Sequence, residues 1–154
     1  MNIKQQNLIE AIESHADIIN FGSTSDAVDN HWVTKAEDYL GVKLPESYLW
    51  FLKNYSGGEI AGEEIYSIYG MEFENINGGD IVFQHIINKR NNLVEEMRIV
   101  VNETDIGEVF FFNYEEFDGI EAPIYINIPS GDIKPYADDF YEFLMMRINL
   151  QNQL

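Results

Sequence analysis

Apolar positions in the first third of the chain recur with the period of a helix. They keep this spacing over residues 2–19 and again over residues 32–40, so we predict two amphipathic helices there. Gly41 supplies the left-handed residue expected just after a helix end. Pro45 suits the first turn of a third helix, which runs to Tyr55, because its missing N–H would have no helical partner there.

The rest of the pattern is mostly that of short strands. Runs rich in Ile, Val, Phe and Tyr predict four of them, at residues 64–69, 98–102, 108–113 and 123–127. The turn at residues 105–107 separates two of these runs, which can pair as an antiparallel hairpin. Residues 80–91 fit either a buried helix or a strand, and we prefer the helix. Acidic residues followed by an apolar stripe predict a terminal helix over residues 138–148.

These elements predict one α+β domain over residues 1–154, in which an antiparallel sheet is the simplest arrangement of the strands. Hydrophobic residues make up 45% of the chain and aromatic residues 14%, which is enough for a folded core. The absence of cysteine excludes disulfides and thiolate sites. There is no signal-peptide pattern and no apolar run near the roughly 20 residues that span a bilayer, so we predict a cytoplasmic protein.

The charges of the chain are strongly acidic and unevenly distributed. Asp and Glu number 27 against 9 Lys and Arg, giving a net charge of -18. Neither Lys nor Arg occurs between Lys53 and Lys89 or between Arg98 and Lys134, and both stretches are rich in carboxylates. Such a surface repels phosphates and anionic lipids, so nucleic-acid and membrane binding are disfavoured and a cationic partner is favoured. If the acidic charge is considered alone, the simpler explanation is that it keeps the protein soluble.

The sequence contains no recognisable catalytic or metal-binding motif. Its histidines are far apart: His15, His31 and His85. Adjacent carboxylates such as Glu63 and Glu64 point to different faces of a helix or strand, so they do not form an acid–base couple by spacing. There is no nucleophile elbow, P-loop or dinucleotide fingerprint, and the glycine pairs at 57–58 and 78–79 are interpreted as turns. We therefore predict no enzyme activity, no cofactor and no metal.

One segment carries a recognisable motif, in residues 37–48 and their continuation to residue 58. It contains a glutamate on a helix, then Leu-Gly-x-x-Leu-Pro-x-x-Tyr, then Phe-Leu and a closing Gly-Gly, with Ser56 where asparagine often stands. This segment resembles the SUKH superfamily (Smi/Knr-like domain). The residues that carry the resemblance, which we expect to be structural, are Glu37, Leu40, Gly41, Leu44, Pro45, Tyr48, Phe51, Leu52, Gly57 and Gly58.

The resemblance implies an α+β fold with a central, mostly antiparallel sheet packed against N-terminal helices and a C-terminal helix. For bacterial members it also implies an immunity protein that binds and neutralises a cognate polymorphic toxin. Many such toxins are nucleases, whose clefts are basic, so an acidic protein can cover them. SUKH relatives also include regulatory adaptors in cell-wall synthesis and signalling, which is the second hypothesis. A carbohydrate or other small-molecule binding module that uses the aromatic residues is the third. We expect a monomer or a weak homodimer.

Partner contacts are predicted in the two acidic stretches that lack Lys and Arg. Three tyrosines there are predicted to be exposed aromatic anchors: Tyr66, Tyr69 and Tyr114. The acidic contact residues are predicted to be Glu59, Glu63, Glu64, Glu72, Glu74, Asp105, Glu108, Glu115, Glu116 and Asp118.

Overall fold

The computed structural model describes residues 1–93 and 97–152 and confirms the α+β class. The α-helices are α1 (Ile3–Ser14), α2 (Asn30–Leu40), α3 (Glu46–Tyr55), α4 (Ile81–Arg90) and α5 (Phe140–Asn152). The strands are β1 (Ile19–Phe21), β2 (Gly58–Ile60), β3 (Glu63–Ile65), β4 (Arg98–Glu103), β5 (Val109–Asn113), β6 (Ile124–Asn127) and β7 (Ile133–Ala137). Three short 3-10 helices are η1 (Thr24–Asp26), η2 (Phe73–Asn75) and η3 (Tyr114–Glu116).

The seven strands form one antiparallel meander in chain order, from β1 to β7. The β2–β3 hairpin turns through Ala61 and Gly62, which both have positive φ (50° and 83°), as the favoured two-residue hairpin turns require. β3 and β4 pair over a short stretch, in which Ile65 lies opposite Asn102. The sheet therefore consists of a small ribbon, β1–β3, and a larger one, β4–β7. The outermost strand β7 carries Pro135 at its centre.

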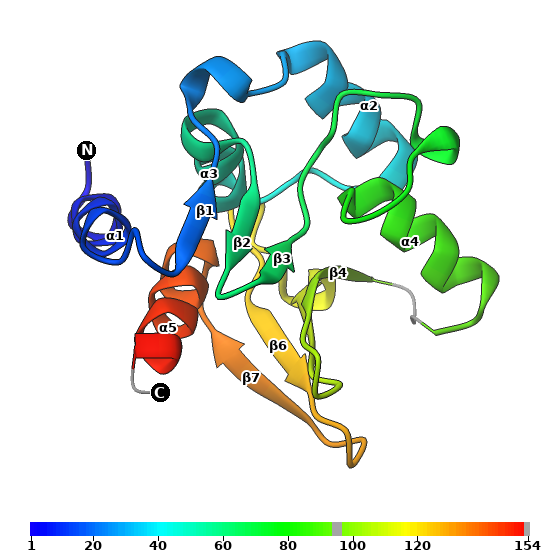
Figure 1. The fold of residues 1–154 in the computed structure, drawn as a ribbon. Helices are drawn as coiled ribbons and strands as arrows, with labels where there is room; N and C mark the ends of the chain where they lie inside the picture. Colours follow the sequence, from blue (N-terminus) through cyan, green and yellow to red (C-terminus); the bar gives the residue numbers. More distant parts are fainter. Residues whose placement is uncertain (94–96, 153–154) are drawn as a thin grey trace.

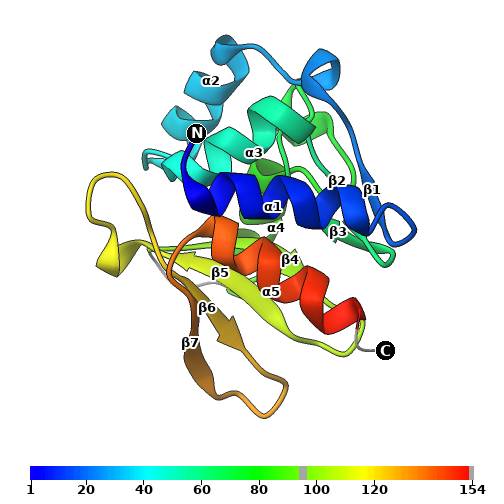
Figure 2. The ribbon, with the colours of Figure 1, turned by 90° about the vertical axis from the view of Figure 1, so that its left-hand side faces the viewer.

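Helices cover both faces of the sheet (Figure 1). α1 and α5 lie side by side on one face, as Figure 2 shows from that side, and α4 lies on the other face against β4. The core joins α3, β5 and α5 through fully buried rings: the Tyr48 centroid is 5.4 Å from that of Phe112 and 5.0 Å from that of Phe140. These edge-to-face contacts between helices and sheet fix how α3 and α5 sit on the strands.

The motif segment builds the corner between α2 and α3. The Glu37 carboxylate accepts a hydrogen bond from the backbone N–H of Leu44 (2.7 Å), while Gly41 takes the left-handed conformation (φ 75°) that ends α2. The Tyr114 hydroxyl donates to the backbone carbonyl of Lys43 (2.8 Å), tying this corner to η3. Most of the other motif side chains are buried in the core: Leu40, Leu44, Pro45, Tyr48, Phe51 and Leu52.

The predicted helix preference for residues 80–91 is confirmed, but the first helix was predicted too long. It ends at Ser14, and Ile19 belongs to β1, where it pairs with Ile60. This pairing with a distant strand overrides the local helical spacing. The predicted strand at residues 64–69 is regular only to Ile65, although Tyr66 N still donates to Val101 O (2.8 Å).

Three strands were not predicted, for reasons visible in their sequences. β1 and β2 have three residues each, too few to show alternation, and β7 is largely exposed and interrupted by Pro135. Gly58, interpreted as a turn residue, lies in β2 instead.

Candidate functional site

Two acidic turns and the end of α5 meet at one edge of the molecule. Figure 2 shows the β2–β3 turn, the β4–β5 turn and the C-terminal end of α5 together on the right. The backbone N–H of Asp105 donates to the Glu63 carboxylate across this junction (3.3 Å). We call the carboxylates of β2, β3 and the β4–β5 turn the hairpin–turn surface: Glu59, Glu63, Glu64, Glu103, Asp105 and Glu108.

A cavity of about 400 Å³ lies between these turns and α5. Arg147 of α5 lies in its wall, with its side chain 5% exposed, and its Nη2 is 3.2 Å from a Glu63 oxygen. The guanidinium also lies 4.8 Å from the centroid of the Phe110 ring. At the rim, Ile106 and Leu150 are exposed (73% and 44%). The site therefore combines carboxylates with an apolar rim, the composition expected for contact with a basic protein surface.

The other face of the β2–β3 hairpin carries a second part of the surface. Glu59 and Glu64 are direct cross-strand partners, so two like charges share one face at an energetic cost. The Tyr69 hydroxyl donates to Glu64 Oε2 (2.6 Å) and accepts from the Gly79 N–H (2.8 Å). Burial and the hydrogen bond to Glu64 raise the pKa of Tyr69 to about 12.

Glu103 and Ile106 were not among the predicted contact residues. Burial raises the pKa of Glu103, and Ile106 projects from the β4–β5 turn. The signal that could have found them was their position: both flank Asp105 in the predicted hairpin turn, where an apolar side chain such as Ile106 has no core to enter.

The other predicted acidic residues lie elsewhere. Glu72 and Glu74 belong to the region of η2, near α2. Glu115, Glu116 and Asp118 lie on and after η3, which Figure 2 shows at the far left, opposite the hairpin–turn surface. The structure thus divides the predicted contact residues among separate surfaces.

Two of the three predicted anchors are not exposed. Tyr66 is 8% and Tyr114 is 3% exposed, whereas Tyr69 is 37% exposed. The backbone carbonyl of Tyr66 accepts from the Tyr48 hydroxyl (2.7 Å), and the Tyr114 ring packs 5.2 Å from Phe117. Both rings belong to the buried core, and strand alternation alone did not reveal this.

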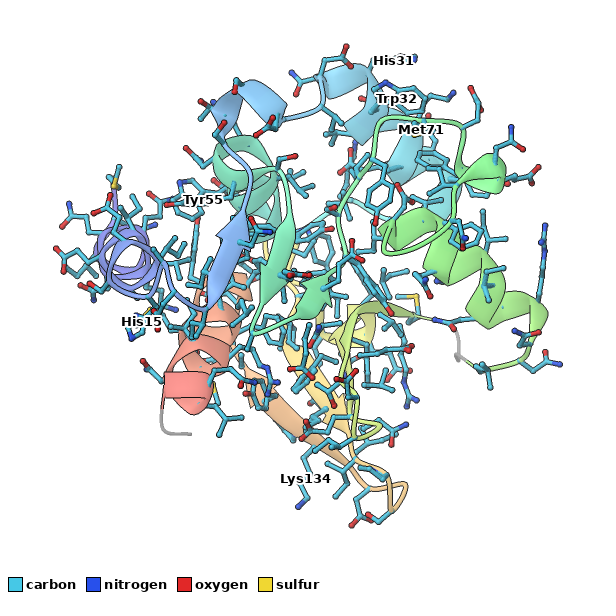
Figure 3. The ribbon with its side chains drawn as sticks, in the orientation of Figure 1. His15, His31, Trp32, Tyr55, Met71 and Lys134 are labelled. Carbon is cyan, nitrogen blue, oxygen red and sulfur yellow. The ribbon has the colours of Figure 1, made fainter. Side chains whose placement is uncertain are left out.

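Within residues 1–93 and 97–152, no group of three or more His, Asp or Glu side chains could hold a metal ion. Two of the histidines, His15 and His31, lie at different corners of the molecule (Figure 3). No helix in the same residues is long and apolar enough to cross a membrane. The hairpin–turn surface has negative charge and a cavity, which suit a cationic ligand.

Three partly buried carboxyl groups are expected to add stability as the pH falls toward their ordinary pKa values. Burial raises the pKa of Asp80, Glu103 and Glu121 in the folded state, so these groups bind protons more readily in the folded chain than in the unfolded chain. His85 acts the other way below its ordinary pKa of 6.5, because burial lowers its pKa. The gain begins as the pH falls through the raised values and is complete below the ordinary ones, 3.8 for Asp and 4.5 for Glu. Urea unfolding at several pH values measures it.

The variant Glu103→Gln should flatten this pH dependence, whereas Glu10→Gln, on exposed α1, should leave its slope nearly unchanged. Asp118 acts the other way, since backbone N–H groups lower its pKa, but only at pH values below its ordinary pKa of 3.8. If Glu103→Gln keeps the same pH dependence of stability as the unmodified protein, the prediction for Glu103 is wrong.

Comparison with known families gives one match. Residues 30–144 match a family model described as SMI1-KNR4 cell-wall. The matched span runs from the start of α2 into α5 and contains the whole motif segment. No curated protein matches the chain.

Proposed function

Because the match covers most of its length, the chain belongs to the SMI1-KNR4 (SUKH) family, and we propose that it is an immunity protein that neutralises a basic toxin by binding. The toxin we propose is a nuclease, since enzymes that hold a polyanion need a basic cleft. The carboxylates of the hairpin–turn surface would occupy or cover that cleft in place of phosphates. The protein itself would perform no chemistry.

The observation that carries this proposal is that most carboxylates of the hairpin–turn surface form no ion pair with a basic side chain of the described residues. Within residues 1–93 and 97–152, no Lys, Arg or His forms an ion pair with Glu59, Glu64, Glu103, Asp105 or Glu108. The cation of this region, Arg147, is buried and already paired with Glu63. A cluster of unpaired carboxylates stores mutual repulsion that a cationic partner relieves, which favours association.

The same surface explains how binding could be both fast and specific. The net charge of -18 attracts a basic partner over a distance of about 10 Å at moderate salt, raising the rate of encounter. Exposed Ile106 and Leu150 then supply apolar area that is buried only when shapes match. Long-range electrostatic attraction would thus set the association rate. The apolar rim, Ile106 and Leu150, would set the dissociation rate.

The test first searches the neighbouring genes for a toxin domain and then measures its binding to this protein, by calorimetry at about 50 and 200 mM salt. We expect Asp105→Lys to weaken binding about 10- to 100-fold and to reduce its salt dependence, because it places a cation against the partner's cations. Asp105 is exposed and its side chain has no partner among the described residues, so the fold should tolerate the change.

The matched control is Glu115→Lys, which makes the same charge change on η3 at the opposite end of the sheet. It should alter binding several-fold less than Asp105→Lys. Equal effects of the two variants would show that only net charge matters. No binding of the unmodified protein would overturn the immunity proposal and favour a regulatory adaptor instead.

A further inference from the structure

A second acidic feature lies at the corner between α2 and η2, away from the hairpin–turn surface. A cavity of about 260 Å³ there is lined by Lys35, Tyr39, Glu72, Phe73, Glu74 and Asn75. The Phe73 ring packs edge-on against Trp32 (5.9 Å between centroids) and against Tyr39 (5.6 Å). Aromatic rings and carboxylates therefore share one small pocket, which we call the α2–η2 pocket.

The α2–η2 pocket already holds a cation that belongs to the chain itself. Lys35 Nζ lies 4.7 Å from the centroid of the Trp32 ring and 3.2 Å from a Glu72 oxygen. An ammonium between an aromatic face and a carboxylate is the standard arrangement for recognising a cation. This intramolecular contact shows that the geometry of the pocket accepts a positive side chain.

The pocket also has charge and apolar surface that Lys35 does not use. Glu74 accepts a hydrogen bond from the Tyr39 hydroxyl (2.8 Å) but forms no ion pair within the described residues. The Tyr39 side chain is 51% exposed and Glu72 is 70% exposed, so both are open to a ligand. Met71 is 55% exposed at the corner where Figure 3 also shows Trp32. A Cβ added to the neighbouring Gly70 would lie 2.9 Å from Val28 Cγ1 and 3.8 Å from the Trp32 ring.

We propose that the α2–η2 pocket receives an arginine side chain from the partner protein. A guanidinium is planar, so it can stack on the exposed Tyr39 ring while donating to the carboxylates of Glu72 and Glu74. A lysine ammonium can meet one ring and one carboxylate, as that of Lys35 does, but it has no planar fork that can stack on a ring while donating to two carboxylates. The inference rests on the proposed function only in taking the partner to be basic, and it adds a second contact to that of the hairpin–turn surface.

The test uses a short blocked peptide with two arginines separated by glycine, and the same peptide with lysines. Binding is followed by nuclear magnetic resonance of the labelled protein, through the indole N–H of Trp32 and the backbone signals of α2 and η2. We expect saturable shifts at these residues and binding of the arginine peptide several-fold tighter than the lysine peptide.

Two pairs of variants make the test specific. Glu72→Gln with Glu74→Gln should weaken binding about 10-fold, whereas Glu10→Gln with Glu13→Gln, on exposed positions of α1, should change it little. Lys35→Met should strengthen binding about 3- to 10-fold by removing the competing ammonium, and Lys53→Met, with the same charge change at the end of α3, should not.

The outcomes separate this inference from the proposed function. Shifts spread over all acidic surfaces, equal binding of both peptides, or equal effects of Lys35→Met and Lys53→Met would overturn the arginine pocket and leave toxin binding untouched. Specific peptide binding in a protein that does not bind the neighbouring toxin would support the pocket and overturn the immunity proposal.

Discussion

Replacing Gly58 with alanine is expected to destabilise the fold by roughly 2–6 kcal/mol, from backbone strain and overpacking together. Gly58 has φ of 137°, and a Cβ placed on it would lie 2.0 Å from Asn20 O and 2.8 Å from Phe21 Cα. These neighbours are backbone atoms of β1, so they can move only if the β1–β2 pairing separates. Urea unfolding monitored by circular dichroism measures the loss.

A matched control isolates the steric part of this effect. Gly41 also has positive φ (75°), but a Cβ added there would meet nothing within 4 Å. Gly41→Ala should therefore cost only the strain of a left-handed alanine, about 1 kcal/mol. If the two alanine variants lose equal stability, the close approach of β1 to Gly58 is not what requires the glycine.

Replacing Arg147 with methionine is expected to cost about 3–5 kcal/mol of stability, because it leaves the partly buried Glu63 carboxylate without its guanidinium. Glu63 would keep only the neutral donors Gln151 Nε2 (3.3 Å) and the Asp105 N–H (3.3 Å). The Phe110 ring would also lose its cation contact. Denaturant unfolding of the variant gives the value directly.

A double-mutant cycle shows whether the loss comes from the unpaired charge. Glu63→Gln removes the carboxylate while keeping its shape, so the double variant with Arg147→Met should recover about half or more of the lost stability. Glu46→Gln, an exposed glutamate at the start of α3, serves as the control partner and should give additive losses. Additive behaviour of Glu63→Gln itself would mean that packing of the Arg147 stem dominates.

The helices could be predicted where local signals were strong. Gly41 ends α2 in the predicted left-handed conformation, and the apolar stripe of α5 is the one that packs on the sheet. Pro45, predicted in the first turn of the third helix, is instead its N-cap with an extended backbone, so α3 begins one residue later, at Glu46. The length of the first helix was not predictable in this way. Ile19 has suitable helical spacing, but its position is decided by Ile60, which is far away in the sequence.

The candidate site was predictable in its residues but not in its arrangement. Glu63 and Asp105 come from separate acidic stretches, and their contact follows from the pairing of β3 with β4. That pairing depends on tertiary packing, which the pattern of a single sequence does not reveal. The same limit explains Tyr66 and Tyr114, whose burial depends on packing with residues distant in the sequence.

The edge strand β7 is poorly suited to pair with a further strand. An edge strand normally offers a row of free backbone donors to any extended chain, but Pro135 has none to give at the middle of β7. Lys134 beside it is exposed and places a charge on the same edge, as Figure 3 shows at the bottom of the molecule. At high protein concentration such an edge is an advantage, because β7 of one copy is a poor template for an extended strand of the next.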